Sequence, residues 1–274
     1  MHLSALHIYP VKSCRGLSVQ SAELDDHGLV GDRRFMVVNA ADGLFLTQRS
    51  HPRMALIETA LTSGNLVLSS PNHGSATTAL YLKAEGSTTQ MSVTVWKNTV
   101  IADDCGDEPA GWLSQFLGLP LRLVRIGSAY DRPVKPNKAQ PGDVVSFADA
   151  FPFLAVSEAS LSDLNDRLAM KDEGPLPMNR FRPNFVIADC EPYTEDTWVR
   201  LKIGDVPFRS GGPCARCPIT TTDQFTAQRG KEPLKTFATY RRDPEDSTKV
   251  NFGTNLIHET KRGTLRVGDE LGLL

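Results

Sequence analysis

Residues 56–69 read LIETALTSGNLVLS, two short apolar runs (56–61 and 65–69) with threonine, serine and glycine between them. Short runs rich in leucine, isoleucine, valine and threonine that end at glycine or serine are typical of β-strands joined by turns. Similar runs occur at residues 3–9, 34–38 and 91–96. Because no helices alternate with these runs, the first hundred residues predict an antiparallel sandwich or barrel.

Two segments have the 3.6-residue periodicity of an amphipathic helix instead. The first follows Asp107, which we expect to be its N-cap, and it ends before Gly118 and Pro120. The second follows Ser157, its expected N-cap, and a weaker helical pattern covers residues 234–241. The apolar stripes of the two clear helices contain Trp112, Leu113, Phe116 and Leu117, and Leu161, Leu164 and Leu168.

Strand-like runs return after residue 144, at residues 184–188, 198–203, 250–257 and 264–274. The whole pattern predicts an α+β protein, predominantly β, with a few peripheral helices. We place a domain boundary near residue 120, which gives domains of residues 1–120 and 121–274. The polar, proline-containing stretch between Gly127 and Gly142 has no periodicity, so it is either an interdomain linker or a mobile loop over a site.

The 274 residues carry a net charge of −2, so no general positive field favours nucleic acid or an anionic membrane as a partner. No apolar run has the roughly 18 residues of a membrane span, and the N-terminus lacks the features of a signal peptide. The five cysteines are odd in number and mostly scattered, which is typical of a reducing compartment. We therefore expect a soluble, cytoplasmic protein that holds any anionic ligand with a local cluster of cations.

The densest chemical signal is GGPCARCP at residues 211–218, a C-x-x-C motif formed by Cys214 and Cys217. Half a zinc site would need completion by a second C-x-x-C, and the sequence has none. A redox pair should open a helix, whereas the threonine run after Cys217 indicates a strand. The remaining interpretations are a structural turn and a single metal-binding thiolate that Arg216 stabilises electrostatically. Spacing alone does not decide among the four.

Three cations lie next to predicted strands, namely Lys12, Arg33 and Arg182. Any one of them alone is more typical of a solvated surface charge. Together they suit a phosphate group, which arginine binds in a bidentate manner and lysine binds as a point charge. We therefore predict that the three converge on one cleft near Cys217.

Other familiar site signatures do not occur in the sequence. There is no G-x-G-x-x-G or P-loop for a nucleotide, no G-x-S-x-G for a hydrolase and no H-E-x-x-H for zinc. No group of four cysteines is available for an iron–sulfur cluster. Among single residues, Asn184 opens an apolar run and can offer donors and acceptors to a heterocycle, whereas Asp149 is typical of a turn.

Seven short motifs follow one another along the chain: YPVKSCRG (9–16), GDRRF (31–35), SEASLSDLN (157–165), FRPN (181–184), PCARC (213–217), KEPL (231–234) and RVGD (266–269). In this order and spacing they resemble the MOSC-domain family. Within that family they resemble the mitochondrial amidoxime-reducing components and their bacterial YcbX relatives. Several independent motifs in register make this resemblance far more specific than the C-x-x-C alone.

The resemblance implies an N-terminal MOSC β-barrel-like domain packed on a β-rich MOSC domain. It also implies a molybdenum–molybdopterin cofactor, small-molecule N-hydroxylated substrates and a two-electron reduction that removes their oxygen. By position, Cys217 would be the metal ligand and the catalytic residue. The residues around the pterin phosphate would be Lys12, Ser13, Arg33 and Arg182, and those along the pterin would be Asp149, Asn184, Ala215, Arg216 and Asn255.

Two departures from the family pattern bear on function. Ala215 stands where relatives often have serine, so a side-chain hydrogen bond is missing. Longer YcbX-type relatives add a ferredoxin-like domain that we do not expect here, so we expect electrons from a separate protein, a flavin reductase with an iron–sulfur or haem carrier.

Two other functions remain open. MOSC domains also occur in molybdenum-cofactor sulfurases, so the first is a cofactor carrier or sulfur-transfer protein without reductase turnover. No pyridoxal-phosphate domain is expected in this chain. The second is a β-domain with a structural C-x-x-C and no cofactor.

Overall fold

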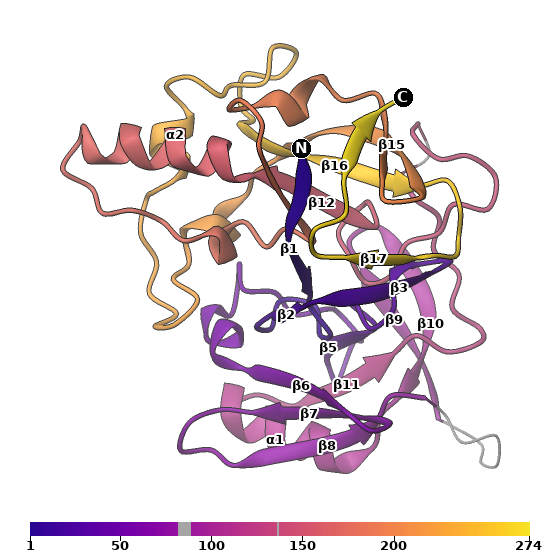
Figure 1. The fold of residues 1–274 in the computed structure, drawn as a ribbon. Helices are drawn as coiled ribbons and strands as arrows, with labels where there is room; N and C mark the ends of the chain where they lie inside the picture. Colours follow the sequence, from indigo (N-terminus) through magenta and orange to yellow (C-terminus); the bar gives the residue numbers. More distant parts are fainter. Residues whose placement is uncertain (82–88, 136) are drawn as a thin grey trace.

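The computed structural model describes residues 1–81, 89–135 and 137–274 (Figure 1). Strands dominate the described residues, and the few helices lie at the periphery. The predicted fold class, α+β and predominantly β, is confirmed. In the part of the chain that the structure describes, no helix is both long and apolar enough to cross a membrane.

An eight-stranded sheet fills the upper half of Figure 1. All its neighbouring strands are antiparallel except β12 and β13, which are parallel and connected through helix α2. A parallel pair needs such a crossover because a tight turn cannot join two strands of the same direction. In spatial order its strands are β18 (Leu271–Leu273), β14 (Arg200–Ile203), β15 (Val206–Ala215), β16 (Asn251–His258), β12 (Phe153–Ser157), β13 (Phe185–Ala188), β1 (His2–Ile8) and β2 (Leu17–Val19).

Three smaller sheets lie beside and below it. The four-stranded sheet contains β5 (Phe35–Asn39), β11 (Leu121–Arg125), β10 (Asn98–Asp104) and β9 (Gln90–Val95). The two three-stranded sheets contain β6 (Glu58–Thr62), β7 (Asn65–Ser69) and β8 (Ser75–Ala79), and β17 (Thr264–Arg266), β3 (Ser21–Asp25) and β4 (Gly28–Leu29).

The hydrogen-bonded sheets cross the proposed division at residue 120. Strand β1 comes from the start of the chain, yet it pairs with β13 inside the eight-stranded sheet. Strand β11 follows residue 120, yet it pairs with β5 and β10 of the four-stranded sheet. The two halves therefore exchange strands, and the boundary itself stays a prediction.

The core beneath the large sheet is aromatic. The rings of Phe153 and Phe185 stack with their centroids 5.1 Å apart, and Phe208 meets Phe153 edge-on at 5.4 Å. All three side chains are fully buried. Every residue of β13 is buried, because helix α2 packs against its other face. A strand that is covered on both faces has apolar residues at successive positions, which explains the sequence FVIA of β13.

Helix α1 (Asp107–Leu117) begins one residue earlier than predicted, with Gly106 as its N-cap. The carboxylate of Asp107 pairs with Arg122 at 2.7 Å instead of capping the helix. Helix α2 (Glu158–Ala169) has the predicted N-cap, because Ser157 accepts a hydrogen bond from the Ser160 N–H at 3.0 Å. The remaining helices are α3 (Leu234–Phe237), shorter than its pattern predicted, and the 3-10 helices η1 (Pro52–Leu56), η2 (Met178–Arg180), η3 (Thr194–Thr197) and η4 (Pro218–Thr221).

The polar stretch between Gly127 and Gly142 packs against the body of the protein. Its described residues Tyr130, Arg132 and Val134 are buried, although residue 136 lies outside the described part. The Val145 N–H donates to the Arg132 carbonyl at 2.9 Å. This stretch is therefore ordered against the four-stranded sheet and the residues that follow it.

We expect Gly253→Ala to lower the free energy of unfolding far more than Gly118→Ala. Both glycines have positive φ, 77° and 79°, so both substitutions strain the backbone by about 1 kcal/mol. At Gly253, however, a β-carbon would lie 2.6 Å from the Ala155 carbonyl oxygen, whereas at Gly118 it would meet nothing within 4 Å. Urea denaturation should show an additional loss of about 2 kcal/mol or more at Gly253. Equal losses at the two positions would contradict this packing.

Candidate functional site

One cavity lies where the eight-stranded sheet meets the loops that lead to β5 and β12, and it collects the residues singled out from the sequence. Lys12, Arg33 and Arg182 all line it together with Cys217, so their predicted convergence is confirmed. Their role as cofactor ligands stays a prediction. All ten candidate residues line this cavity: Lys12, Ser13, Arg33, Asp149, Arg182, Asn184, Ala215, Arg216, Cys217 and Asn255.

Strand ends bring these residues together. Lys12 and Ser13 follow β1, Arg33 precedes β5, and Arg182 precedes β13. Ser13, Arg33 and Arg182 have φ values of 66°, 48° and 57°, in the left-handed region that non-glycine residues rarely adopt. Such strain is concentrated at functional sites, where the surrounding structure enforces it. Three strained positions around one cavity therefore support a binding role.

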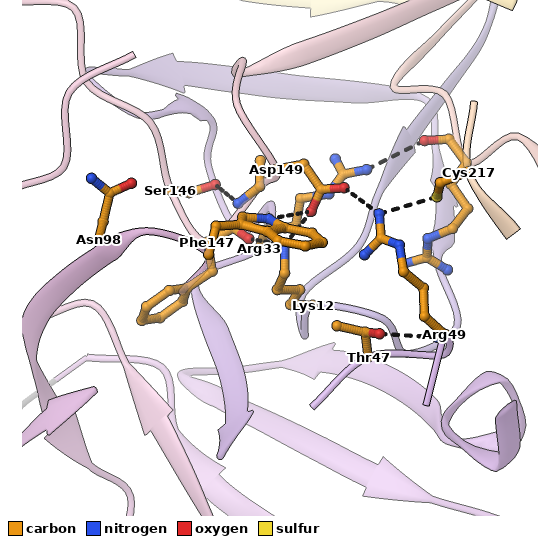
Figure 2. A network of polar contacts seen from close by, with 12 residues as sticks. Lys12, Arg33, Thr47, Arg49, Asn98, Ser146, Phe147, Asp149 and Cys217 are labelled. Atoms are coloured by element: carbon orange, nitrogen blue, oxygen red, sulfur yellow. Dashed lines mark hydrogen bonds and ion pairs between the residues drawn. The ribbon is translucent and has the colours of Figure 1, made fainter. Parts of the chain in front are cut away.

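Asp149 is the centre of a polar network in the cavity (Figure 2). Its Oδ1 accepts a hydrogen bond from Lys12 Nζ at 2.5 Å and another from Trp96 Nε1 at 3.2 Å. Its Oδ2 accepts from Arg49 Nη2 at 3.1 Å. Lys12 also donates to the Phe147 carbonyl at 2.7 Å. The carboxylate thus holds two cations and an indole in place, which makes it an anchor for the cavity wall.

The charges of this network are strongly coupled. Burial lowers the pKa of Lys12 to about 8, although the Asp149 carboxylate raises it in part. Burial alone would raise the pKa of Asp149, but the Lys12 and Arg49 charges outweigh that effect and hold it well below its ordinary value. At neutral pH the carboxylate is therefore ionised and the lysine is mostly protonated.

Arg132 fixes the segment that carries Asp149. Its side chain is buried, and its Nη1 donates to the carbonyls of Ser146 and Ala148 at 2.8 and 2.6 Å. Its Nη2 donates to the Asp149 carbonyl at 2.6 Å. The stretch after Gly127, of uncertain role in the sequence, therefore supports the site from behind.

Arg33 and Arg182 share one aromatic ring. Their guanidinium carbons lie 4.5 and 4.3 Å from the centroid of the buried Tyr9 ring. Asp32 pairs with Arg33 at 2.6 Å. Burial, and the charge of Arg33, lower the pKa of Arg182 to about 10. Two like charges in close proximity favour the binding of an anion between or beside them.

The two asparagines make hydrogen bonds within the protein wall. Asn184 Oδ1 accepts from Arg33 Nη1 at 3.0 Å, and its Nδ2 donates to the His7 carbonyl at 3.1 Å. Asn255 Nδ2 donates to the carbonyls of Gly212 and Pro213 at 3.1 and 3.2 Å. Asn184 therefore orients an arginine, and Asn255 supports the strand that carries the C-x-x-C motif.

The two thiols contact different guanidinium groups, and the electrostatic role assigned to Arg216 toward Cys217 stays a prediction. Arg216 Nη1 lies 3.1 Å from Cys214 Sγ, whereas Arg49 Nη2 lies 3.0 Å from Cys217 Sγ. Cys214 and Arg216 are two residues apart at the end of β15, where alternate side chains point to the same side. Burial raises the pKa of Cys214 in spite of Arg216.

The threonine run after Cys217 forms the 3-10 helix η4, so the predicted strand is wrong. Pro218 occupies the first turn, where proline is favourable. The hydroxyls of Thr220 and Thr221 donate to the carbonyls of Cys217 and Pro218 at 3.0 and 2.8 Å. These local hydrogen bonds compete with strand pairing. Cys217 is consequently the N-cap residue of a short helix.

Arg49 and Trp96 are functional candidates that the sequence did not reveal. Arg49 lies in a turn before η1, and its guanidinium carbon is 4.5 Å from the Trp96 ring centroid. Neither residue belongs to a motif, and only the fold places them beside Asp149 and Cys217. A lone arginine or tryptophan at a turn has no local signal of such a role.

The cavity has the chemistry for an anion bound beside a thiolate. Three lining guanidinium groups each contain a buried nitrogen without a hydrogen-bond partner, namely Arg49 Nη1, Arg182 Nη2 and Arg216 Nε. Buried donors are nearly always satisfied, so such nitrogens indicate acceptors supplied by a ligand such as phosphate. Among the described residues, no group of three or more histidine, cysteine or acidic side chains could hold a metal. A metal here would need most of its ligands from a cofactor, and the residues fit that arrangement.

Comparisons with known proteins find the same domain family that the seven sequence motifs resemble. Residues 1–120 match the MOSC N-terminal beta barrel domain, and residues 142–272 match the MOSC domain. The chain is 37% identical to human mitochondrial amidoxime-reducing component 1, over 99% of this chain and 82% of that protein. It is also 37% identical to rat mitochondrial amidoxime reducing component 2, over 97% of this chain and 81% of that one. Rice molybdenum cofactor sulfurase is 34% identical over 94% of this chain but only 33% of the sulfurase.

We expect the stability difference between the wild type and Lys12→Met to depend on pH. The pKa of Lys12 is about 8 in the folded protein and 10.5 ordinarily, so between these values the unfolded chain binds more protons. The free energy of unfolding should therefore rise with pH in the wild type, by up to roughly 3 kcal/mol relative to the variant.

Urea unfolding at several pH values across this window measures the effect. Lys97→Met is the matched control, because it removes an exposed lysine from the same part of the protein. A wild-type-minus-Lys12→Met difference that is constant with pH would show that burial does not perturb this lysine.

Proposed function

The chain belongs to the MOSC-domain family, and on that premise we propose that it is a molybdenum-cofactor-dependent reductase of N-hydroxylated compounds. The observation that carries this proposal is the cavity, which three partly unsatisfied arginines line together with Cys217. The names of its relatives connect the family to amidoxime reduction and to the molybdenum cofactor.

The chain's own residues would hold the cofactor. Arg33 and Arg182 offer guanidinium groups to a phosphate, with the nearby Ser13 hydroxyl as a further donor. Lys12 contributes charge but spends hydrogen bonds on Asp149 and the Phe147 carbonyl. The floor of the cavity at Ala215 and Arg216 would face the pterin, where the alanine leaves room but offers no side-chain hydrogen bond.

Cys217 is the residue that we assign as metal ligand and catalytic residue. Its thiolate is a soft ligand, and Arg49 donates to its sulfur from the opposite wall. When bound, the molybdenum–molybdopterin cofactor supplies the two-electron chemistry. Overall, an N-hydroxylated nitrogen gains two electrons and two protons, its N–O bond breaks, and the oxygen leaves as water.

Electrons would come from a separate protein. The sequence has no dinucleotide fingerprint. Its five cysteines do not form the cluster of four that would hold an iron–sulfur centre. A flavin reductase with an iron–sulfur or haem carrier is the class of donor that we propose.

A cofactor carrier or sulfur-transfer protein is the second candidate function. It is favoured by the similarity to the rice sulfurase, which covers 94% of this chain. That similarity covers only 33% of the sulfurase. Turnover of an amidoxime by the cofactor-loaded chain distinguishes the reductase from the carrier.

We expect Cys217→Ser to abolish amidoxime reduction with a chemical reductant while the protein remains folded. A serine hydroxyl is a hard, mostly protonated ligand that replaces the thiolate poorly at a soft metal. Cys214→Ser is the matched control and should retain molybdenum and much of the activity, because this thiol contacts Arg216. Activity, molybdenum content and circular dichroism of both variants decide the matter. An inactive Cys214→Ser protein beside an active Cys217→Ser protein would reverse the assignment.

We expect Arg182→Ala to lower pterin occupancy by about tenfold or more, with a smaller effect on thermal stability. A hydrogen bond to a charged group contributes about 1.5–3 kcal/mol. Arg182 Nη2 is buried without a hydrogen-bond partner, so removing it breaks no hydrogen bond within the protein. Fluorescence of the oxidised pterin measures occupancy. Arg180→Ala is the control, because Arg180 pairs with Asp223 at 2.9 Å. A loss of stability without a loss of pterin would contradict the phosphate role.

A further inference from the structure

Trp96 occupies a strained position at the tip of a hairpin. Strands β9 and β10 are joined by a two-residue turn, because Val95 pairs with Asn98. Trp96 is the first of the two turn residues and has a φ of 56°. Glycine, asparagine and aspartate are preferred in such turns, and positive φ for a bulky residue is an outlier. A tryptophan in this position indicates that its side chain is needed where the turn places it.

The indole is both fixed and accessible. Its Nε1–H donates to Asp149, the Arg49 guanidinium stacks 4.5 Å from its centroid, and Phe45 packs against it at 4.9 Å. These contacts place the ring beside the cavity that Asp149 and Arg49 line. Yet 42% of Trp96 is exposed, whereas Trp112 and Trp198 are buried. An aromatic surface held rigidly beside a site can bind a ligand at little entropic cost.

The charges around the indole select the kind of ligand. Arg49 already lies against the ring, and Lys12 Nζ is 5.9 Å from its centroid. A cationic ligand would meet these like charges, whereas a neutral planar group would not. Amidoximes are neutral at pH 7, while the amidines formed from them are protonated, because loss of the hydroxyl group raises the basicity of the nitrogen.

We propose that Trp96 is a specificity-determining residue, whose exposed indole surface stacks on a neutral, planar, conjugated part of the substrate. The inference rests on the proposed reductase function and deepens it. Aromatic amidoximes and N-hydroxylated heterocyclic bases have such a group, whereas small aliphatic amidoximes offer less area to stack. Offset stacking is the geometry that aromatic pairs prefer.

Two variants separate stacking from support of Asp149. Trp96→Phe and Trp96→Leu both remove the Nε1–H donor, but only the leucine variant removes the aromatic ring. The measured quantity is kcat/KM for benzamidoxime divided by kcat/KM for acetamidoxime. We expect this ratio to fall about 3- to 10-fold in Trp96→Leu and to change less than about 2-fold in Trp96→Phe. If Trp96 had only a structural role, kcat/KM would fall by the same factor for both substrates in both variants.

Binding to the cofactor-free chain gives a readout that does not depend on turnover. Benzamidoxime should quench the fluorescence of the exposed Trp96 in the wild type, and Trp96→Phe should abolish this response. Equilibrium dialysis should show weaker benzamidoxime binding by Trp96→Leu than by Trp96→Phe.

The outcomes are distinct. An unchanged substrate ratio in Trp96→Leu, or no quenching in the wild type, overturns the role of Trp96. If the loaded protein reduces neither amidoxime but the cofactor-free chain binds benzamidoxime through Trp96, the reductase function fails and the stacking site stands. If Trp96→Leu does not fold, the wild-type quenching and its loss in Trp96→Phe still decide the inference.

Discussion

Repulsion among cations is the constraint around which the site is built. Five side chains of the same charge line one cavity, and the protein itself provides few anions to offset them. Asp149 neutralises part of this charge at one wall, and Asp32 does so at another. An anionic ligand would supply the rest of the balance. The five are Lys12, Arg33, Arg49, Arg182 and Arg216.

Rigid supports hold the charges against this repulsion. The buried ring of Tyr9 receives two guanidinium groups, and Gly16 lies so close to that ring that a β-carbon there would be 2.4 Å from it. The buried Arg132 ties down the segment that carries Asp149. Backbone strain at the cationic positions is a further cost, which the packing around them sustains. The protein's own contacts thus hold the cavity wall in place.

The sequence predicted those features that depend on neighbours along the chain. Short apolar runs gave the strands, and Ser157 identified its helix start because a cap acts within a few residues. Family motifs indicated the cavity residues. Contacts between distant segments were beyond such reasoning. Arg49 reaches Cys217 across 168 positions, and the nearer Arg216 turns to Cys214 because of strand geometry. The threonines after Pro218 form a helix since their hydroxyls bond locally, against their usual strand preference.

The pairing of β1 with β13 has a consequence for how the molecule is made. Leu6 lies opposite Phe185, so the strand that presents Lys12 must wait for a partner synthesised roughly 180 residues later. Such non-local pairing gives a high contact order. A loop of that length must close, at a cost in chain entropy, before the contacts between the two strands can stabilise the fold. The cavity therefore cannot be complete on a nascent chain before its last lining residue, Asn255, has been synthesised. Any ligand of this cavity accordingly meets a chain whose first and last lining residues have already been brought together by folding.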